Sequence, residues 1–522
     1  MGRYFRMRSL LVPFVMAMAA HACMAQSMSA RAAARFLDQS SWGPTPSSIA
    51  ELQSRGIDNW LAEQFAMNTS DLPDQEILTS AGISNNNLAP VQAAFFQNAV
   101  SEPDQLRQRV AFILSQIWVV SATSGVSPAY AYPPYWRIFR DNAFGNYRDV
   151  IKAVTLSPAM GRYLNMANNN KGNASLGTSP NENYARELMQ LFTLGLTQLH
   201  LDGTPVLDAN NNPIPTYDQS VVTNMARLLT GWTYPTAPGT AAKNNNPAYY
   251  FGQMFAVNAD HDTTSKTIVG NVKVSASQSA EQDLESLLDA LMAQPTMAPF
   301  ISQQLIQHLV TSNPSPAYIQ RVAQVFQDDG TGTAGNLQAV ITAILTDPEA
   351  RAGDASASAI TPTFGHLREP ILFMANVLRG LSATVAATNS VAGTASNLGE
   401  NLFYAPSVFS YFSPQSRTAK GLYGPEFQIY STQTAALRAN AVNTLIYGTL
   451  GGVKLDLSPF TALAGNSSQL LDYIAQVFLH GSMSTQLESA AMSAMNAVSA
   501  PVTKAQAALY IVLTSSEYQI VQ

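Results

Sequence analysis

Hydrophobic positions along this chain recur mostly with the period of an α-helix. Apolar residues stand three and four positions apart, polar residues fill the gaps, and Gly, Pro or Asn clusters separate one such segment from the next. The clearest of these segments are 101–118, 218–229, 281–292, 298–310, 316–327 and 335–345. The pattern predicts a mainly α, multi-helical globular unit.

Two kinds of segment depart from the helical period. Residues 200–217 place turn formers such as Asp202-Gly203 between short β-prone pieces, which predicts a small β-hairpin as the only notable β structure. Residues 129–147 and 402–430 combine Tyr, Trp and Phe with Pro, and we expect long aromatic loops there. The aromatic side chains of 129–147 either pack on the core or form a platform on which a sugar ring stacks.

The length and composition of the chain allow a large core. The chain has 522 residues, and 46% of them are hydrophobic. We therefore expect residues 26–522 to form a single large helical domain. Two lobes with a boundary near residue 275 are the alternative.

The low charge of the chain limits its class of partner. Only 12% of residues are charged, and the formal net charge is −6. No stripe of Lys and Arg occurs that would attract a phosphate backbone. Nucleic acid is therefore not an expected partner.

Residues 1–25 have the pattern of a secretory signal peptide. Three arginines precede the apolar run 10–20 and small residues follow it, so we expect cleavage after Ala25. No later stretch reaches about 18 uninterrupted apolar residues, so no transmembrane segment is expected in the mature chain. The mature protein is then periplasmic or secreted and has no thiol. The alternative is a lipoprotein acylated at Cys23, the only cysteine of the chain.

The densest chemistry lies in the stretch 178–195. Ser179 stands three residues before Glu182, which is the spacing of a capping box. Pro180 suits the first helical position, and Gly195 supplies a stop. We therefore expect one sharply bounded helix.

One face of this expected helix is polar. At about 100° per residue, its polar side chains share an arc of roughly 140°. These side chains are Glu182, Asn183, Arg186, Glu187 and Gln190. In a chain with so few charges, this concentration marks the face as the candidate site.

The polar face supports a hypothesis of carboxylate-assisted hydrolysis. Two carboxyl groups in different environments can divide the acid and base roles that cleave glycosidic bonds. The candidate catalytic residues are Glu182, Arg186, Glu187, His261 and Asp262. The candidate substrate-binding residues are Asn183, Trp232, Arg368 and Glu369. The alternative is a purely structural network, because Glu182 has a capping role and an i,i+4 partner in Arg186.

The cofactor stays open, with a divalent metal as the candidate. Asp260, His261 and Asp262 offer ligands for such an ion. The turn that begins at Asp208 also supplies oxygen atoms at alternate positions. It lacks the Gly and the terminal Glu of a calcium-binding loop, which favours a plain Asx-rich turn.

Several short motifs together resemble one family. They are 41–45 (SWGPT), 180–188 (PNENYAREL), 191–195 (LFTLG), 229–232 (LTGW), His261-Asp262 with Lys266, 367–370 (LREP), 405–409 (APSVF) and 425–427 (PEF). On these motifs the chain is similar to the secreted bacterial family catalogued as domain of unknown function 1800. Gln294-Pro295 departs from it, since many members have His-Pro there.

The resemblance implies a mainly helical secreted protein and no established reaction. It also implies that a neighbouring gene often encodes a secreted protein with an alkaline-phosphatase-like fold. Three functions therefore stay open: a hydrolase acting on glycan, a non-catalytic scaffold that binds glycan or protein, and an assembly factor for a co-encoded secreted protein. Convergence of Glu182, Glu187, His261 and Glu369 on one cleft would favour the hydrolase.

Overall fold

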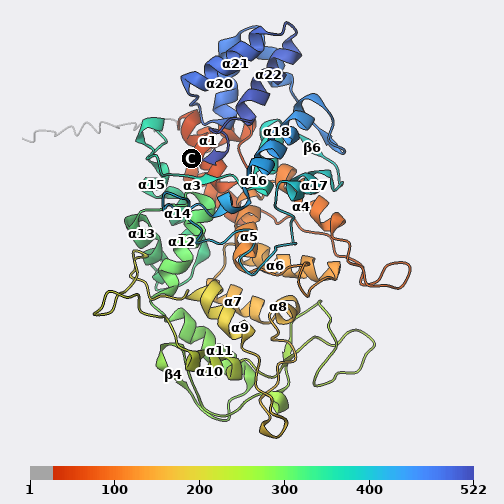
Figure 1. The fold of residues 1–522 in the computed structure, drawn as a ribbon, viewed down its shortest axis with the longest axis vertical. Coiled ribbons are helices and arrows are strands. Elements are labelled where there is room, and N and C mark those ends of the chain that lie inside the picture. Colours follow the sequence, from red (N-terminus) through yellow and green to blue (C-terminus); the bar gives the residue numbers. More distant parts are fainter. Residues whose placement is uncertain (1–27) are drawn as a thin grey trace, which may run out of the picture.

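The computed structural model describes residues 28–522. The predicted signal peptide and Cys23 lie outside these described residues. Within them, helices dominate and strands occur only as short antiparallel pairs (Figure 1). This confirms the prediction of a mainly α fold. In the part that the structure describes, no helix has both the length and the apolar character needed to cross a bilayer.

The α-helices have the following bounds. Those of the first third are α1 (Ala30–Ser40), α2 (Pro46–Arg55), α3 (Ile57–Ala66), α4 (Ala89–Ser101), α5 (Gln105–Ile117), α6 (Tyr132–Asn142), α7 (Tyr147–Thr155) and α8 (Pro158–Tyr163). Those of the middle third are α9 (Asn183–Glu187), α10 (Gln219–Leu228), α11 (Ala280–Met292), α12 (Met297–Leu309), α13 (Pro316–Gln327), α14 (Leu337–Thr346) and α15 (Pro348–Arg351). Those of the last third are α16 (Pro370–Gly380), α17 (Ser390–Asn397), α18 (Thr432–Tyr447), α19 (Ser458–Leu463), α20 (Ser467–Phe478), α21 (Thr485–Asn496) and α22 (Pro501–Leu513).

Most helices with a clear apolar period occur where the pattern predicts them. The predicted segments 281–292 and 316–327 differ from α11 and α13 by at most one residue at either end. The segment 101–118 is an exception at its start, because Ser101 ends α4 and α5 begins only at Gln105. Hydrophobic periodicity therefore located the helices, while one boundary depended on the neighbouring helix.

The strands form four short antiparallel pairs. The pairs are β1 (Trp232–Thr233) with β2 (Phe255–Ala256), β3 (Lys266–Ile268) with β4 (Val272–Val274), β5 (His366–Leu367) with β8 (Ile520–Val521), and β6 (Thr384–Val385) with β7 (Val453–Lys454). Only β3 and β4 are joined by a tight turn, in which Gly270 has φ +70°. The pair β5 and β8 ties the end of the chain to the start of α16.

The predicted hairpin at 200–217 is present only as a folded segment with isolated bridges. These join Thr197 to Pro215, Leu199 to Pro205 and Leu207 to Pro213. Each bridge includes a proline, which has no N–H to donate and so prevents a continuous ladder. The expectation that this segment is the only notable β structure was wrong, because β3 and β4 form a regular hairpin elsewhere.

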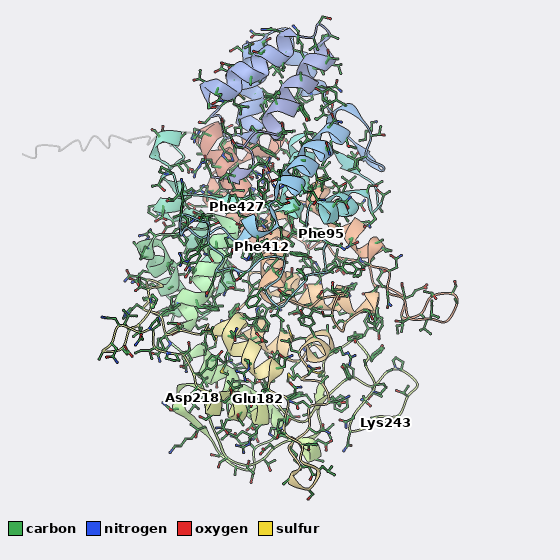
Figure 2. The ribbon with its side chains drawn as sticks, viewed as in Figure 1. Phe95, Glu182, Asp218, Lys243, Phe412 and Phe427 are labelled. Atoms are coloured by element: carbon green, nitrogen blue, oxygen red, sulfur yellow. The ribbon has the colours of Figure 1, made fainter. Side chains whose placement is uncertain are left out.

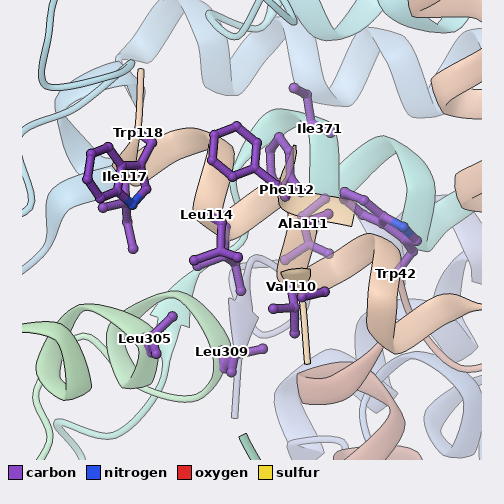
Figure 3. Close-up of a cluster of buried hydrophobic side chains, with 14 of the residues drawn as sticks. Trp42, Val110, Ala111, Phe112, Leu114, Ile117, Trp118, Leu305, Leu309 and Ile371 are labelled. Atoms are coloured by element: carbon purple, nitrogen blue, oxygen red, sulfur yellow. The ribbon is translucent and has the colours of Figure 1, made fainter. Parts of the chain in front are cut away.

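The centre of the core is formed by α5 and α16. All eleven residues of α16 are buried, as expected for a helix that is apolar on nearly every side. Figure 3 shows Trp42 beside Phe112 of α5, with Ile371 of α16 close by. The rings of Trp42 and Phe112 lie 5.2 Å apart. The buried hydrophobic cluster that includes these residues runs from Ala33 to Val521.

Helices that precede residue 275 in the sequence pack against helices that follow it. Helix α11, which follows it, packs against α7 and α10, which precede it. Helices α20, α21 and α22 pack together at the top of Figure 1, and α20 also contacts α1. Segments from both ends of the chain thus share one interface.

The aromatic segment 129–147 contributes to the core. Tyr130, Tyr132, Tyr135 and Trp136 are buried. This confirms the packing interpretation over the sugar platform. The expectation of a loop was wrong for residues 132–142, which form α6 with Pro133 in its first turn, where a missing N–H costs nothing. The segment 402–424 contains no helix, as expected.

A buried polar cluster joins the two ends of the chain. Arg368 donates two hydrogen bonds to Asp38 of α1, at 2.6 and 3.0 Å. His480 Nε2 lies 2.9 Å from Asp38 Oδ2, and Asn376 of α16 donates to Oδ1 at 2.8 Å. Burial alone would raise the pKa of Asp38, but Arg368 and His480 outweigh it and hold this pKa well below its usual range. Asp38 is therefore ionised and fully paired.

Asp38→Asn should lower the free energy of unfolding at pH 7 by about 3–5 kcal/mol, because it leaves the buried Arg368 without its counter-charge. Urea denaturation would measure this. Asp472→Asn, an exposed change on α20, should stay within about 0.5 kcal/mol.

The pH dependence of stability provides a second test of the same pair. Since folding depresses the pKa of Asp38, its contribution is complete above the pKa of an unfolded Asp, about 3.9, and is lost as the pH falls below that value. Between pH 4 and pH 2 the parent should therefore lose more stability than Asp38→Asn. Equal losses would contradict the role given to Asp38.

Candidate functional site

The helix that carries the predicted site is shorter than expected at its start. Helix α9 begins at Asn183, and Ser179 does not cap it. Its N-cap residue is Glu182, whose side chain makes no capping bond, and the Asn183 N–H donates instead to the side chain of Asn181 at 2.9 Å. Asn169 bonds both the N–H and the carbonyl of Asn181, at 2.8 and 3.1 Å, and so holds residue 181 outside the helix. The predicted capping box was therefore wrong.

A π-helix continues α9. It runs from Leu188 to Thr193, and the Leu194 N–H bonds the carbonyl of Met189 at 2.9 Å, five residues back. The Thr193 hydroxyl donates to the carbonyl of Leu188 at 2.6 Å, also five residues back. Such π segments are rare and are frequent at functional sites. The transition between the two helix types falls directly after Glu187.

Glu182 is the centre of a hydrogen-bonded network with α10. It accepts from Gln219 Nε2 at 2.9 Å, from the Thr223 hydroxyl at 2.8 Å and from Arg186 at 3.0 Å. Its partial burial would raise its pKa, but the bonds from Gln219, Thr223 and Arg186 outweigh burial and lower it. Figure 2 shows Glu182 in the lower part of the molecule, close to Asp218, which caps α10. Glu182 is thus held in its ionised form.

Glu187 lies in the opposite kind of environment. Its Oε2 is buried and has no hydrogen-bond partner among the described residues, and burial raises its pKa against the opposing charge of Arg186. The hydroxyl of the half-buried Tyr217 is likewise unpaired within residues 28–522. Burial and the negative charge of Glu187 raise the pKa of Tyr163 to about 12. Glu187 is therefore protonated up to a higher pH than an exposed glutamate, and its Oε2 is free to bond a ligand.

His261 is fully buried and has a polar partner at each ring nitrogen. Its Nδ1 lies 2.9 Å from the carbonyl oxygen of Thr230, and its Nε2 lies 3.1 Å from Asp283 Oδ2. Lys266 Nζ donates to the same Asp283 oxygen at 2.8 Å. Sequence reasoning missed Asp283, although a charged residue on the apolar face of α11, between Ala280 and Leu284, is a signal of a buried pair.

Asp262 is hydrogen-bonded to Arg227 of α10. It accepts from Arg227 Nε at 2.8 Å, and its N–H donates to the Thr230 hydroxyl at 2.9 Å. Burial would raise the pKa of Asp262, but the bonds from Arg227 and Thr264 lower it to about 2. Gln219, Thr223 and Arg227 stand four residues apart on α10, so one face of this helix binds both Glu182 and Asp262.

The other predicted residues lie elsewhere. Arg368 and Glu369 are buried next to α16 in the upper half of Figure 1, whereas α9 lies in the lower half. Trp232 is buried in β1. Asn183 and Gln190 remain half-buried beside Glu182 and Glu187. The structure thus groups the residues of α9 and links them to Asp262 through α10, but it does not bring all four of Glu182, Glu187, His261 and Glu369 into one cleft.

Within residues 28–522, no three His, Cys, Asp or Glu side chains are grouped closely enough to hold an ion. Asp208 instead accepts the N–H groups of Asn210 and Asn212 at 2.8 and 2.9 Å, which forms an Asx-type turn.

The chain matches the model of a family described as protein of unknown function (DUF1800) over residues 35–520. It therefore belongs to this family, as its motifs predicted. No curated protein and no solved structure matches the chain.

Gly231→Ala should destabilise the protein by disturbing the close packing of residue 231 against His261. Gly231 has φ +85°, and an added Cβ would lie 3.0 Å from the backbone nitrogen of His261. Gly239→Ala is the matched control, because its φ of +73° imposes a similar strain but leaves the Cβ in open space. Gly231→Ala should cost about 1–3 kcal/mol more than Gly239→Ala in thermal unfolding, since only the former is overpacked. Equal costs would contradict this close approach.

Proposed function

We propose that this chain is an exported hydrolase that cleaves glycosidic bonds with Glu187 as general acid and Glu182 as general base. One observation carries the proposal: the two environments move the pKa values of these carboxyl groups in opposite directions. Such a division is what an acid and base pair needs at one pH.

The proposed chemistry uses the two carboxyl groups in turn. Protonated Glu187 donates its proton to the oxygen of the leaving sugar. Ionised Glu182 takes a proton from a water molecule, whose oxygen forms the new bond to the anomeric carbon. Arg186 lies between them and keeps Glu182 ionised.

Neighbouring groups support this assignment. The unpaired hydroxyl of Tyr217 and the amides of Asn183 and Gln190 can bond sugar hydroxyls. The unpaired oxygen of Glu187 costs folding free energy, and such costs are typical of functional sites. Export, as the signal pattern of residues 1–25 predicts, would bring the enzyme to the polymers of the envelope.

The second candidate is a non-catalytic scaffold that binds glycan or a co-encoded secreted protein. It is favoured by the bonds among Glu182, Arg186, Gln219 and Thr223, which already occupy much of the polar face. Polysaccharide pull-down and co-purification would detect such partners without turnover.

Glu187→Gln should abolish hydrolysis of natural glycans while leaving the melting temperature at pH 7 unchanged or slightly raised. Folding raises the pKa of Glu187, so its ionised form costs stability above that pKa, and the neutral amide removes the cost. Glu488→Gln, an exposed change on α21, should alter neither property.

The leaving group distinguishes a general acid from other roles. A dinitrophenyl glycoside leaves without protonation, so Glu187→Gln should retain much of its activity on that substrate but not on an alkyl glycoside. The parent's activity should fall as the pH rises through the raised pKa of Glu187. Equal losses on both substrates would refute the acid role. A parent that is inactive on every glycan would refute the hydrolase and leave the non-catalytic scaffold as the remaining candidate.

A further inference from the structure

Two buried carboxyl groups meet at the first turn of α16. Glu369 is the N-cap residue of this helix, and Glu400 Oε2 accepts the N–H of Ile371 at 2.8 Å. Both glutamate side chains are buried, and they lie within hydrogen-bonding distance of each other. Glu369 and Glu400 are called the carboxyl pair below. The proposed hydrolase uses neither of them.

One arginine balances the charge of the carboxyl pair. Arg109 Nη1 of α5 lies 3.6 Å from Glu369 Oε1, and Gln116 Nε2 donates to Glu369 Oε2 at 2.9 Å. Glu400 Oε1, in contrast, is buried and has no hydrogen-bond partner that donates to it within residues 28–522. A carboxylate is therefore stabilised on Glu369. Glu400 suits the pair best as a protonated carboxyl group whose O–H donates to that carboxylate.

The groups that face Glu400 favour its protonated form. Burial and the negative charge of Glu369 raise the pKa of Glu400 well above its usual value. The N–H of Ile371 and the positive charge of Arg438 oppose this rise but do not outweigh it. Tyr411 also faces Glu400, but its hydroxyl donates to a backbone carbonyl instead. Glu400 therefore holds its proton to a much higher pH than an exposed glutamate does.

Glu369 is the member of the pair that ionises first. Burial raises the pKa of Glu369, and Arg109 and Gln116 oppose this rise. On its other side, Glu426 adds to the rise and His366 opposes it. Glu369 thus has a positive charge and a side-chain donor beside it, so the negative charge of the pair lies there.

Glu400 also belongs to a strained segment. Residues 399–412 form no helix, and the N–H of Ala122 bonds the carbonyl of Phe403 at 2.9 Å to attach them to the core. Phe403 and Ser410 have φ values of +70° and +62°, a backbone region that residues with side chains rarely adopt. Such strain persists only where surrounding contacts offset it. The carboxyl pair is one of these contacts.

We propose that Glu369 and Glu400 share one proton and form a pH-sensitive switch, which holds the segment 399–412 on the core while the proton is bound and loosens it at alkaline pH. When the proton passes to solvent, two buried carboxylates face Arg109. This arrangement costs free energy unless the two groups separate, and the strain of the segment favours separation. The switch does not depend on the proposed hydrolase.

Glu400→Gln tests the shared proton. Its amide can donate to Glu369 and accept from Ile371, so it imitates the protonated form at every pH. Folding raises the pKa of Glu400, so the stability that its proton supplies is present below the pKa of an unfolded Glu, about 4.3, and is lost as the pH rises toward the folded pKa. Between pH 5 and pH 8, urea denaturation should show the unfolding constant of the parent rising faster than that of Glu400→Gln, by up to about tenfold per pH unit.

Other carboxyl groups do not confuse this comparison. Glu187 is present in both proteins and contributes equally to their pH dependence. Glu488→Gln, an exposed change on α21, should keep the pH dependence of the parent. Parallel pH dependence in the parent and Glu400→Gln would contradict the shared proton. Failure of Glu400→Gln to fold would contradict it too, because a neutral amide replaces a protonated carboxyl group but not a carboxylate.

Hydrogen exchange tests the loosening of the segment. With the full mature chain, and after correction for the effect of pH on exchange chemistry, peptides from 399–412 should exchange faster at pH 9 than at pH 6. Peptides from α21 should show no such difference. In Glu400→Gln the segment should exchange alike at both pH values. The proposal is overturned if the segment in the parent shows no acceleration, or if Glu400→Gln shows the same acceleration as the parent.

Discussion

The buried ion pair between Asp38 and Arg368 is the constraint on which the rest of the structure depends. It joins α1 to the start of α16, and His480 and Asn376 complete the hydrogen bonds of the carboxylate. A buried charge is costly unless it is paired and bonded in this way. The arrangement therefore requires the N-terminal helix, the central helix and the helices near the C-terminus to assemble together.

Two glycines in the motifs of this chain allow close approaches between distant segments. A Cβ on Gly43 would lie 2.2 Å from Asn376 Nδ2, so only glycine allows α16 to pack there. Thr230 and Gly231 contact His261. These residues hold segments that are distant in sequence against each other.

The carboxyl groups of this protein separate into two classes by environment. Asp38 and Glu182 are each bonded to several donors, which outweigh burial and lower their pKa values. Glu187 and Glu400 lack enough donors, and burial raises theirs. Since folding does not benefit from the second class, the unpaired oxygen of Glu187 marks the position where a ligand would add a missing hydrogen bond.

The sequence by itself determined the helical class, the position of most helices and the polar face of α9, because these follow from hydrophobic period and helical spacing. It also identified Glu182, Arg186 and Glu187 as neighbours. Only the tertiary structure decided that Asn181 accepts the first N–H of α9, that Asp283 pairs with His261 and Lys266, and that Arg368 pairs with Asp38. Local spacing reaches one or two turns of a helix, whereas burial and long-range pairing depend on segments hundreds of residues apart, and these decide which charges are paired and which remain free.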